Sequence, residues 1–181
     1  MGSQKKRVVA LQILLVIGML VSLFLVYEHF STKQSKFCTF DDSPFDCGIV
    51  NKSPYASLDG ISFLLTLDFG LPIPLVQIDE IHWILDLLTG NAFLGFLTLL
   101  FVFFLIRAKQ KEKGLWWIKE AHVQRWIAWL LTFGVLYGAY LFFIQHYILK
   151  IYCLFCLILD LILITACIIA WTLGKSEDQE L

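Results

Sequence analysis

The chain has 181 residues, of which 59% are hydrophobic and only 16% are charged. A soluble domain is about 45–50% apolar, so this excess, gathered in long runs, indicates an integral membrane protein. The net charge of −1 is uninformative as a total. The sequence contains neither a glycine-rich phosphate loop nor a basic, aromatic-rich patch, which argues against nucleotide and nucleic-acid binding.

Four apolar segments are each close to the ~20 residues that cross a bilayer. They cover residues 8–28, 91–106, 126–147 and 153–173. The first follows three basic residues, as in a signal peptide, but it is longer than a signal-peptide core and no small-residue cleavage site follows it. We therefore predict an all-α integral membrane protein, with a four-transmembrane-helix bundle over residues 8–173 and a cytoplasmic tail at 174–181.

The long segment 29–90 lies between the first two predicted helices. Its apolar part, residues 61–88, is interrupted by acidic residues and by Pro72 and Pro74. This pattern favours short interfacial or half-buried helices over a membrane span. We therefore expect 29–90 to form an extracytoplasmic cap made of loops and half-helices.

The distribution of Lys and Arg sets the orientation, because short cytoplasmic loops are enriched in these residues. With the N-terminus inside, ten of the fourteen basic residues fall on the cytoplasmic side. Both termini are then cytoplasmic, and four of the five cysteines lie on the opposite, oxidising face. The fifth, Cys167, lies deep in the last helix, where we expect it only to pack.

The four remaining cysteines form two pairs with different spacing. Cys153 and Cys156 share one face at the start of a helix, where exposed N–H groups stabilise a thiolate. Cys38 and Cys47 are separated by eight residues in a polar loop. A movable pair beside a fixed pair suits stepwise thiol–disulfide exchange from an external protein to a membrane acceptor. A four-cysteine zinc site and two structural disulfides are the alternatives.

The sequence resembles the vitamin K epoxide reductase (VKOR) family of membrane thiol oxidoreductases, in its prokaryotic form. The resemblance rests on "YEHF", "CGIVNKSPYASLDGI", "YGAYLFFIQ" and "CLFC", in that order along the chain. It implies a four-helix bundle around a quinone pocket that residues 48–90 cover. It also implies that Cys156 faces the quinone, that Cys153 exchanges with Cys47 and that Cys38 meets the partner protein.

The resemblance further implies that Ser53 helps to hold the cap and that Asn91 donates a hydrogen bond to a quinone oxygen. Four residues after the second CxxC cysteine, vertebrate members place a tyrosine, whereas this sequence has Asp160. An acidic residue inside a membrane helix is costly, so we expect Asp160 either to serve quinone binding or proton delivery or to form a packing hydrogen bond. Tyr140 is a candidate lining residue of the quinone pocket.

Some family members carry a fused thioredoxin-like domain, which this sequence does not show after residue 173. We therefore expect a separate extracytoplasmic thioredoxin-fold partner and a location in a prokaryotic cell membrane. Two alternatives to this disulfide-forming function remain. They are a vitamin K epoxide or quinone reductase proper, which uses the same relay, and a non-catalytic membrane scaffold held by disulfides.

Three smaller features complete the sequence-based expectations. His29 and His146 are predicted at the extracytoplasmic interface, where a surface position is favoured over a catalytic one. The small-xxx-small pattern from Gly134 to Gly138 predicts close helix packing.

Overall fold

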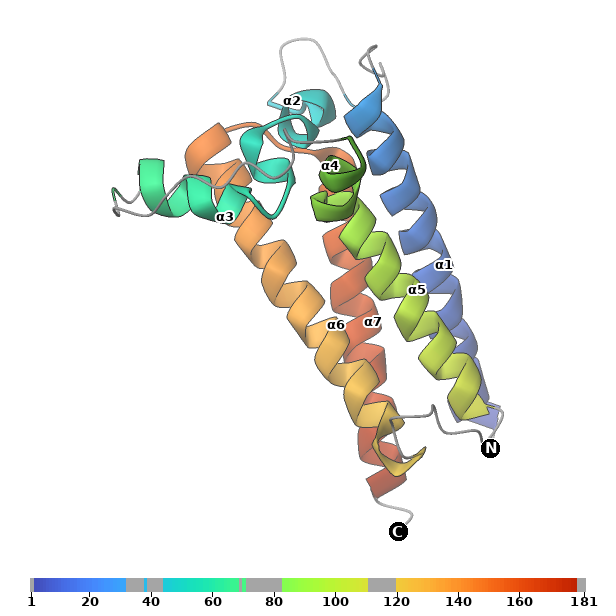
Figure 1. The fold of residues 1–181 in the computed structure, drawn as a ribbon. Helices are drawn as coiled ribbons and strands as arrows, with labels where there is room; N and C mark the ends of the chain where they lie inside the picture. Colours follow the sequence, from blue (N-terminus) through green and yellow to red (C-terminus); the bar gives the residue numbers. More distant parts are fainter. Residues whose placement is uncertain are drawn as a thin grey trace.

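The computed structural model describes residues 2–31, 38, 44–68, 70, 83–110 and 120–178. Four long helices run side by side through the molecule: α1 (Gly2–Phe30), α5 (Asn91–Gln110), α6 (Glu120–Phe143) and α7 (Leu154–Asp178) (Figure 1). Each contains a segment long and apolar enough to cross a membrane. The predicted fold class, an all-α four-helix membrane bundle, is confirmed.

The helices form because uninterrupted apolar residues in a bilayer must satisfy their backbone polar groups within the segment. The observed bounds differ from the expected ones mainly at the helix ends. α5 continues to Gln110, and α7 continues to Asp178, into the segment expected to be a tail. α6 begins at Glu120 and passes without a break into a π-helical segment, η3 (Ile144–Leu149).

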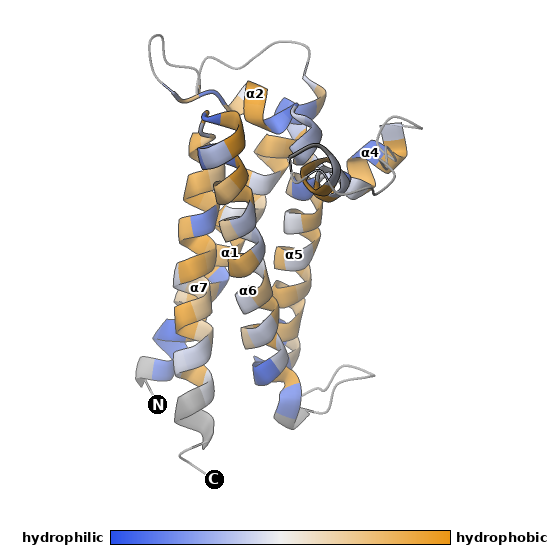
Figure 2. Cartoon of the chain, turned by 90° about the vertical axis from the view of Figure 1, so that its left-hand side faces the viewer, coloured by the Kyte–Doolittle hydropathy of each residue, from blue (hydrophilic) through white to orange (hydrophobic). Residues whose placement is uncertain are grey.

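The interior of the bundle is apolar and continuous. α1 packs against α5 and α7, and α6 packs against α7 and α5. Leu15 of α1, Val102 of α5, Ile127 of α6 and Ala166 of α7 are fully buried in one cluster. Figure 2 shows that hydrophobic residues dominate the long helices. Many of their large apolar side chains are exposed, which is the surface that a lipid environment requires.

Five short elements cover one end of the bundle. They are α2 (Cys47–Asn51), η1 (Pro54–Ala56), α3 (Gly60–Phe63), η2 (Leu64–Asp68) and α4 (Trp83–Thr89). We call residues 44–68 and 83–90 the cap. The start of α1 and the end of α7 lie at the opposite end of the bundle (Figure 1).

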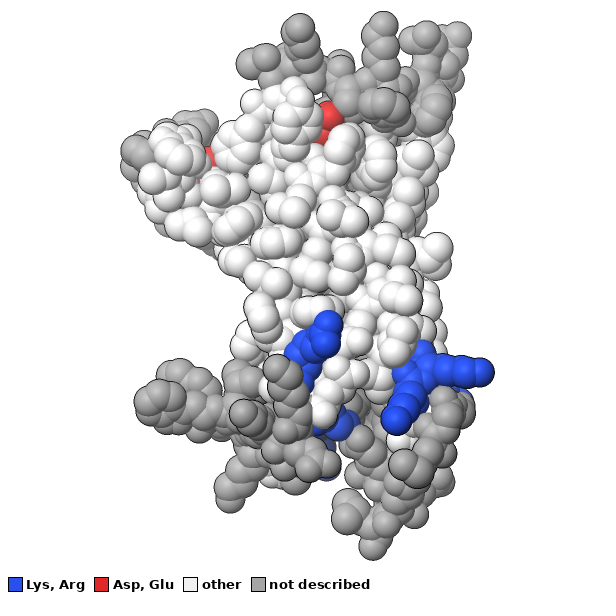
Figure 3. All heavy atoms as spheres, turned by 90° about the vertical axis from the view of Figure 1, so that its right-hand side faces the viewer, with Lys and Arg blue, Asp and Glu red and all other residues white. Residues whose placement is uncertain are grey.

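Most of the described basic residues lie at the end of the bundle away from the cap. Figure 3 shows Lys and Arg side chains gathered at the end away from the cap. The described basic residues on this side of the bundle come from α1, α5 and the start of α6, and they include Lys5, Lys6, Arg107 and Arg125.

Candidate functional site

The four paired cysteines meet beneath the cap. Cys38 and Cys47 form one disulfide, with their Cα atoms 5.6 Å apart, and Cys153 and Cys156 form the other, with a Cα–Cα distance of 5.2 Å. Cys38, Cys47 and Cys153 are all buried and pack in one cluster with Leu25 and Val50. The structure therefore brings together all four cysteines expected to be catalytic, in the state in which both pairs are oxidised.

Backbone hydrogen bonds hold the two cysteine-bearing segments next to each other. Asp46 N–H donates to Tyr152 O at 3.0 Å, and Tyr152 N–H donates to Pro44 O at 2.8 Å. Phe45 and Tyr152 thereby form a parallel bridge. Because each bridging segment immediately precedes a cysteine, this short ladder places Cys47 beside Cys153.

Both Cys47 and Cys153 lie at helix N-termini. Cys47 is the first residue of α2, where the Asp46 side chain caps the helix by accepting from Ile49 N–H at 3.0 Å. Cys153 immediately precedes α7, and its Sγ accepts a hydrogen bond from Cys156 N–H at 3.1 Å. A thiolate formed at Cys153 would keep this donor, as expected for a cysteine at a helix N-terminus.

A cavity opens beside the second disulfide, between the cap and the helices α1, α5, α6 and α7. The empty space there is about 610 Å³ when the part open to solvent is counted, so the enclosed cavity itself is much smaller. Most of the lining is apolar, with Leu25, Ala92, Ile144 and Leu159 among the side chains. The expected site residues Ser53, Asn91, Cys156 and Asp160 all line it. Cys156, but not Cys153, reaches this cavity.

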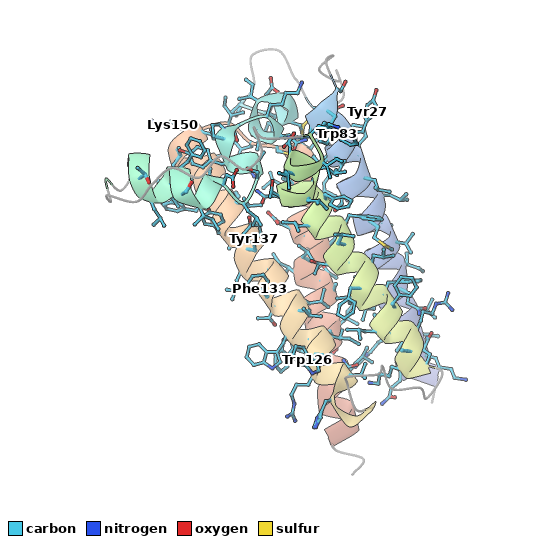
Figure 4. The ribbon with its side chains drawn as sticks, in the orientation of Figure 1. Tyr27, Trp83, Trp126, Phe133, Tyr137 and Lys150 are labelled. Atoms are coloured by element: carbon cyan, nitrogen blue, oxygen red, sulfur yellow. A yellow bond between two sulfur atoms is a disulfide. The ribbon has the colours of Figure 1, made fainter. Side chains whose placement is uncertain are left out.

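Asn91 is fixed from two sides at the start of α5. Its Nδ2 donates to Tyr55 O of the cap at 2.9 Å, and its Oδ1 accepts from the Tyr137 hydroxyl at 2.7 Å. Figure 4 shows Tyr137 in the half of α6 that lies towards the cap. These two bonds leave one amide N–H of Asn91 for a ligand in the cavity.

Ser53 helps to shape the cap. Its hydroxyl donates to Val50 O at 2.8 Å and so satisfies a carbonyl at the end of α2. The next turn is tight, because a Cβ atom built on Gly60 would lie 2.6 Å from Tyr55 Cα. Only glycine fits at this close approach, which explains the glycine in the "SPYASLDG" stretch.

Asp160 lies one helical turn after Cys156 on the same face of α7. Its carboxylate packs against Gly138 of α6, where an added Cβ atom would overlap Asp160 Oδ1. The predicted close packing at this glycine therefore has a specific neighbour. Asp160 also lines a second, apolar groove between α6 and α7, together with Ala139 and Leu157.

Of the four residues expected to bind the quinone, Ser53, Asn91 and Asp160 line the cavity and Tyr140 does not. Its ring lies 5.6 Å from that of Tyr137, and its hydroxyl is buried without a hydrogen-bond partner in the described part of the chain. Tyr137 does not line the cavity either, but its hydroxyl bonds Asn91, which does.

The structure also contains polar contacts that the sequence patterns did not reveal. His29, at the end of α1, faces Asn51 O with Nδ1 at 2.6 Å and Asp86 Oδ1 with Nε2 at 2.9 Å. It thereby joins α1 to two cap helices and is only partly exposed. Gln145, buried in η3, accepts from Cys153 N–H at 2.8 Å. The partners of His29 are distant in sequence, and the Gln145–Cys153 contact depends on the turn after η3, so neither contact has a signal in local sequence.

The bundle, the cap and the paired cysteines define a membrane protein with a disulfide beside an apolar cavity. The model of the vitamin K epoxide reductase family matches residues 9–171 of the chain. The protein therefore belongs to this family, whose members are membrane oxidoreductases of disulfides and quinones, and the resemblance drawn from the motifs is confirmed. Neither a curated protein nor a solved structure matches the chain significantly.

Proposed function

We propose that this protein oxidises the thiols of a separate thioredoxin-fold protein and passes the electrons to a membrane quinone, and so supports disulfide bond formation. Electrons enter at Cys38 and Cys47, move to Cys153 and Cys156, and leave to the quinone. One observation carries the proposal. Cys156 lines the cavity, while its partner Cys153 packs against the other disulfide. The CxxC pair thus contacts both the donor and the acceptor side.

The exchange between the two pairs balances in two steps. When the first pair is reduced, the Cys47 thiolate attacks Cys153 Sγ, the Cys153–Cys156 bond breaks and Cys156 is released as a thiolate in the cavity. Cys38 then attacks Cys47, which closes the Cys38–Cys47 disulfide and frees Cys153. The CxxC pair now holds two electrons. Loss of these electrons to the quinone restores the Cys153–Cys156 disulfide.

The cavity residues fit a quinone as the acceptor. A quinone takes up two electrons and two protons, and its flat apolar ring suits the mostly apolar lining. Asn91 offers its remaining amide N–H to a quinone oxygen. Asp160, one turn from Cys156, binds the quinone or delivers a proton to it. Ser53 holds the cap above the ring, and Tyr140 contributes only through its contact with Tyr137.

The oxidised state described here hides the entry point of the relay. The Cys38 side chain is 1% exposed. A thiolate of a partner protein must reach a disulfide sulfur in order to attack it. Exchange with the partner therefore requires an arrangement in which Cys38 is uncovered.

The basic end of the bundle supports the proposed orientation. Lys and Arg gather at the end that carries the start of α1 and the end of α7, opposite the cap and the cysteines (Figure 3). We place this end in the cytoplasm of a prokaryotic cell and the cysteine relay on the extracytoplasmic side, where disulfides persist.

The function is tested with purified protein in detergent, a short-chain quinone and two reductants in turn: dithiothreitol and a reduced thioredoxin-fold protein. Quinone absorbance should fall with either reductant in the wild type and with neither in Cys156→Ala. Cys38→Ala should keep the reaction with dithiothreitol and lose it with the protein. A wild type without activity, or activity indifferent to Cys156, would favour a disulfide-held scaffold instead.

A further inference from the structure

Gln145 occupies an unusual place for a polar side chain in a membrane helix. It lies in η3, directly after α6, and its side chain is 3% exposed. The π-helical segment ends at Lys150, which adopts a left-handed conformation with φ of 54°. The chain then turns back to Cys153, so that the Gln145 amide meets the start of α7.

The oxygen and the nitrogen of the Gln145 amide differ in their hydrogen bonds. Its Oε1 accepts the Cys153 N–H bond at 2.8 Å. Its Nε2, which carries two N–H donors, has no hydrogen-bond partner within the described residues, and Gln145 lines the cavity that Cys156 also reaches. An amide nitrogen in an apolar environment is strongly favoured to find an acceptor.

The other two amides of the cavity wall each already donate one hydrogen bond from Nδ2. Asn91 uses both ends of its side chain, and Asn51 donates its Nδ2 to Leu25 O. Among the amides that line the described cavity, Gln145 therefore presents the nitrogen with the most unused donors. Its oxygen is tied to the same CxxC segment whose second cysteine faces the acceptor.

We propose that Gln145 donates a hydrogen bond from Nε2 to a carbonyl oxygen of the quinone while its Oε1 fixes the backbone of Cys153. One side chain thereby sets the position of the quinone relative to the redox disulfide. The donor also stabilises the reduced quinone, because negative charge gathers on the oxygens during reduction. This inference rests on the proposed function and adds a specific binding residue to it.

The test compares wild type with Gln145→Met, an apolar side chain of similar length. The readout is the infrared carbonyl band of a short-chain quinone labelled with carbon-13 at its carbonyl groups and bound to the oxidised protein. A hydrogen bond lowers this frequency, so Gln145→Met should lose the part of the wild-type shift that Gln145 causes and keep the part that Asn91 causes. With dithiothreitol as reductant, KM for the quinone should rise roughly 2- to 10-fold, the effect of one neutral hydrogen bond.

Gln124→Met is the matched control. Gln124 is likewise a buried glutamine, but it belongs to α6, lies towards the other end of the bundle and bonds Lys109 Nζ and Ala170 O. This variant should keep the shifted band and the wild-type KM. If Gln145→Met does not fold, Gln145→Glu replaces it, measured with the carboxyl group ionised, because a carboxylate still accepts from Cys153 N–H but donates nothing.

Two results would overturn the inference. An unchanged carbonyl band with slower turnover would mean that Gln145 only positions the CxxC segment. An unchanged band with unchanged kinetics would remove Gln145 from the site altogether. The band is measured without turnover, so a wild type that binds the quinone but does not reduce it would refute the proposed function and leave the Gln145 contact to be judged separately.

Discussion

At the scale of single residues, the contact between Gly138 and Asp160 gives a sharp expectation. A methyl group at Gly138 would overlap the Asp160 carboxylate, whereas one at Gly134 would meet Leu163 Cδ2 at an ordinary 3.5 Å. We expect Gly138→Ala to lower the unfolding temperature relative to Gly134→Ala, with a cost of about 1–3 kcal/mol for the overlap. Thermal unfolding of both variants in detergent measures the difference.

Adding Asp160→Ala to Gly138→Ala tests whether the overlap with the carboxylate causes the loss of stability. Asp160→Ala removes the carboxylate that the new methyl group would meet. It should therefore abolish most of the penalty of Gly138→Ala in the double variant, since contacting residues are not additive. Equal effects of Gly138→Ala with and without Asp160 would show that the glycine is needed for another reason.

The site residues divide into those that motifs reveal and those that only the fold reveals. Cys153, Cys156 and Asp160 stand out in sequence, because their types are unusual in an apolar helix and their spacing puts them on one face. Gln145 carries no such signal. Its contact with Cys153 depends on the π-helical segment and the left-handed Lys150, which no periodicity predicts. The sequence analysis named Tyr140, whereas the bond to Asn91 that singles out Tyr137 joins two helices and has no local signal.

At the scale of elements, the cap is attached to the bundle by His29. Both ring nitrogens face acceptors, Asn51 O and Asp86 Oδ1, so the imidazole links α1, α2 and α4. We expect His29→Leu and Asp86→Leu each to lower stability by about 1–3 kcal/mol, because each leaves a polar partner of a part-buried network unpaired. Thermal unfolding in detergent gives the values.

The double variant tests whether this link is a single unit. If His29 and Asp86 stabilise the cap through each other, His29→Leu combined with Asp86→Leu should cost less than the sum of the two single changes. Thr98→Val serves as a control, since Thr98 bonds only Leu94 O within its own helix. Strict additivity of the His29 and Asp86 variants would argue against the link.

The long helices and the cap differ in how far sequence predicts them. Some 20 consecutive apolar residues identify a membrane helix on their own. Each of the four predicted segments is part of a long apolar helix in the structure. The cap elements are three to seven residues long and are held by contacts such as the Phe45–Tyr152 bridge and the Asn91–Tyr55 bond. Such contacts depend on distant segments, so local patterns gave only an irregular cap.

At the scale of the whole molecule, the distribution of charge predicts the orientation in the membrane. Lys5 lies near the start of α1, at the end of the bundle away from the cap, and Lys52 lies in the cap. Both side chains are exposed. In a background without native cysteines, we expect a membrane-impermeant maleimide to label Lys52→Cys in intact cells. Lys5→Cys should react only after permeabilisation. The reverse pattern would invert the orientation and place the relay on the reducing side.

The most direct measurement of the relay traps its intermediate. In Cys38→Ala/Cys156→Ala, only Cys47, Cys153 and the half-buried Cys167 remain. After mild oxidation, peptide mass spectrometry should find a Cys47–Cys153 disulfide and a free Cys167, because the Phe45–Tyr152 bridge already holds the two segments together. The complementary variant Cys47→Ala/Cys153→Ala should form no such bond between Cys38 and Cys156. Failure of Cys47 and Cys153 to pair, or equal pairing in both variants, would contradict the relay.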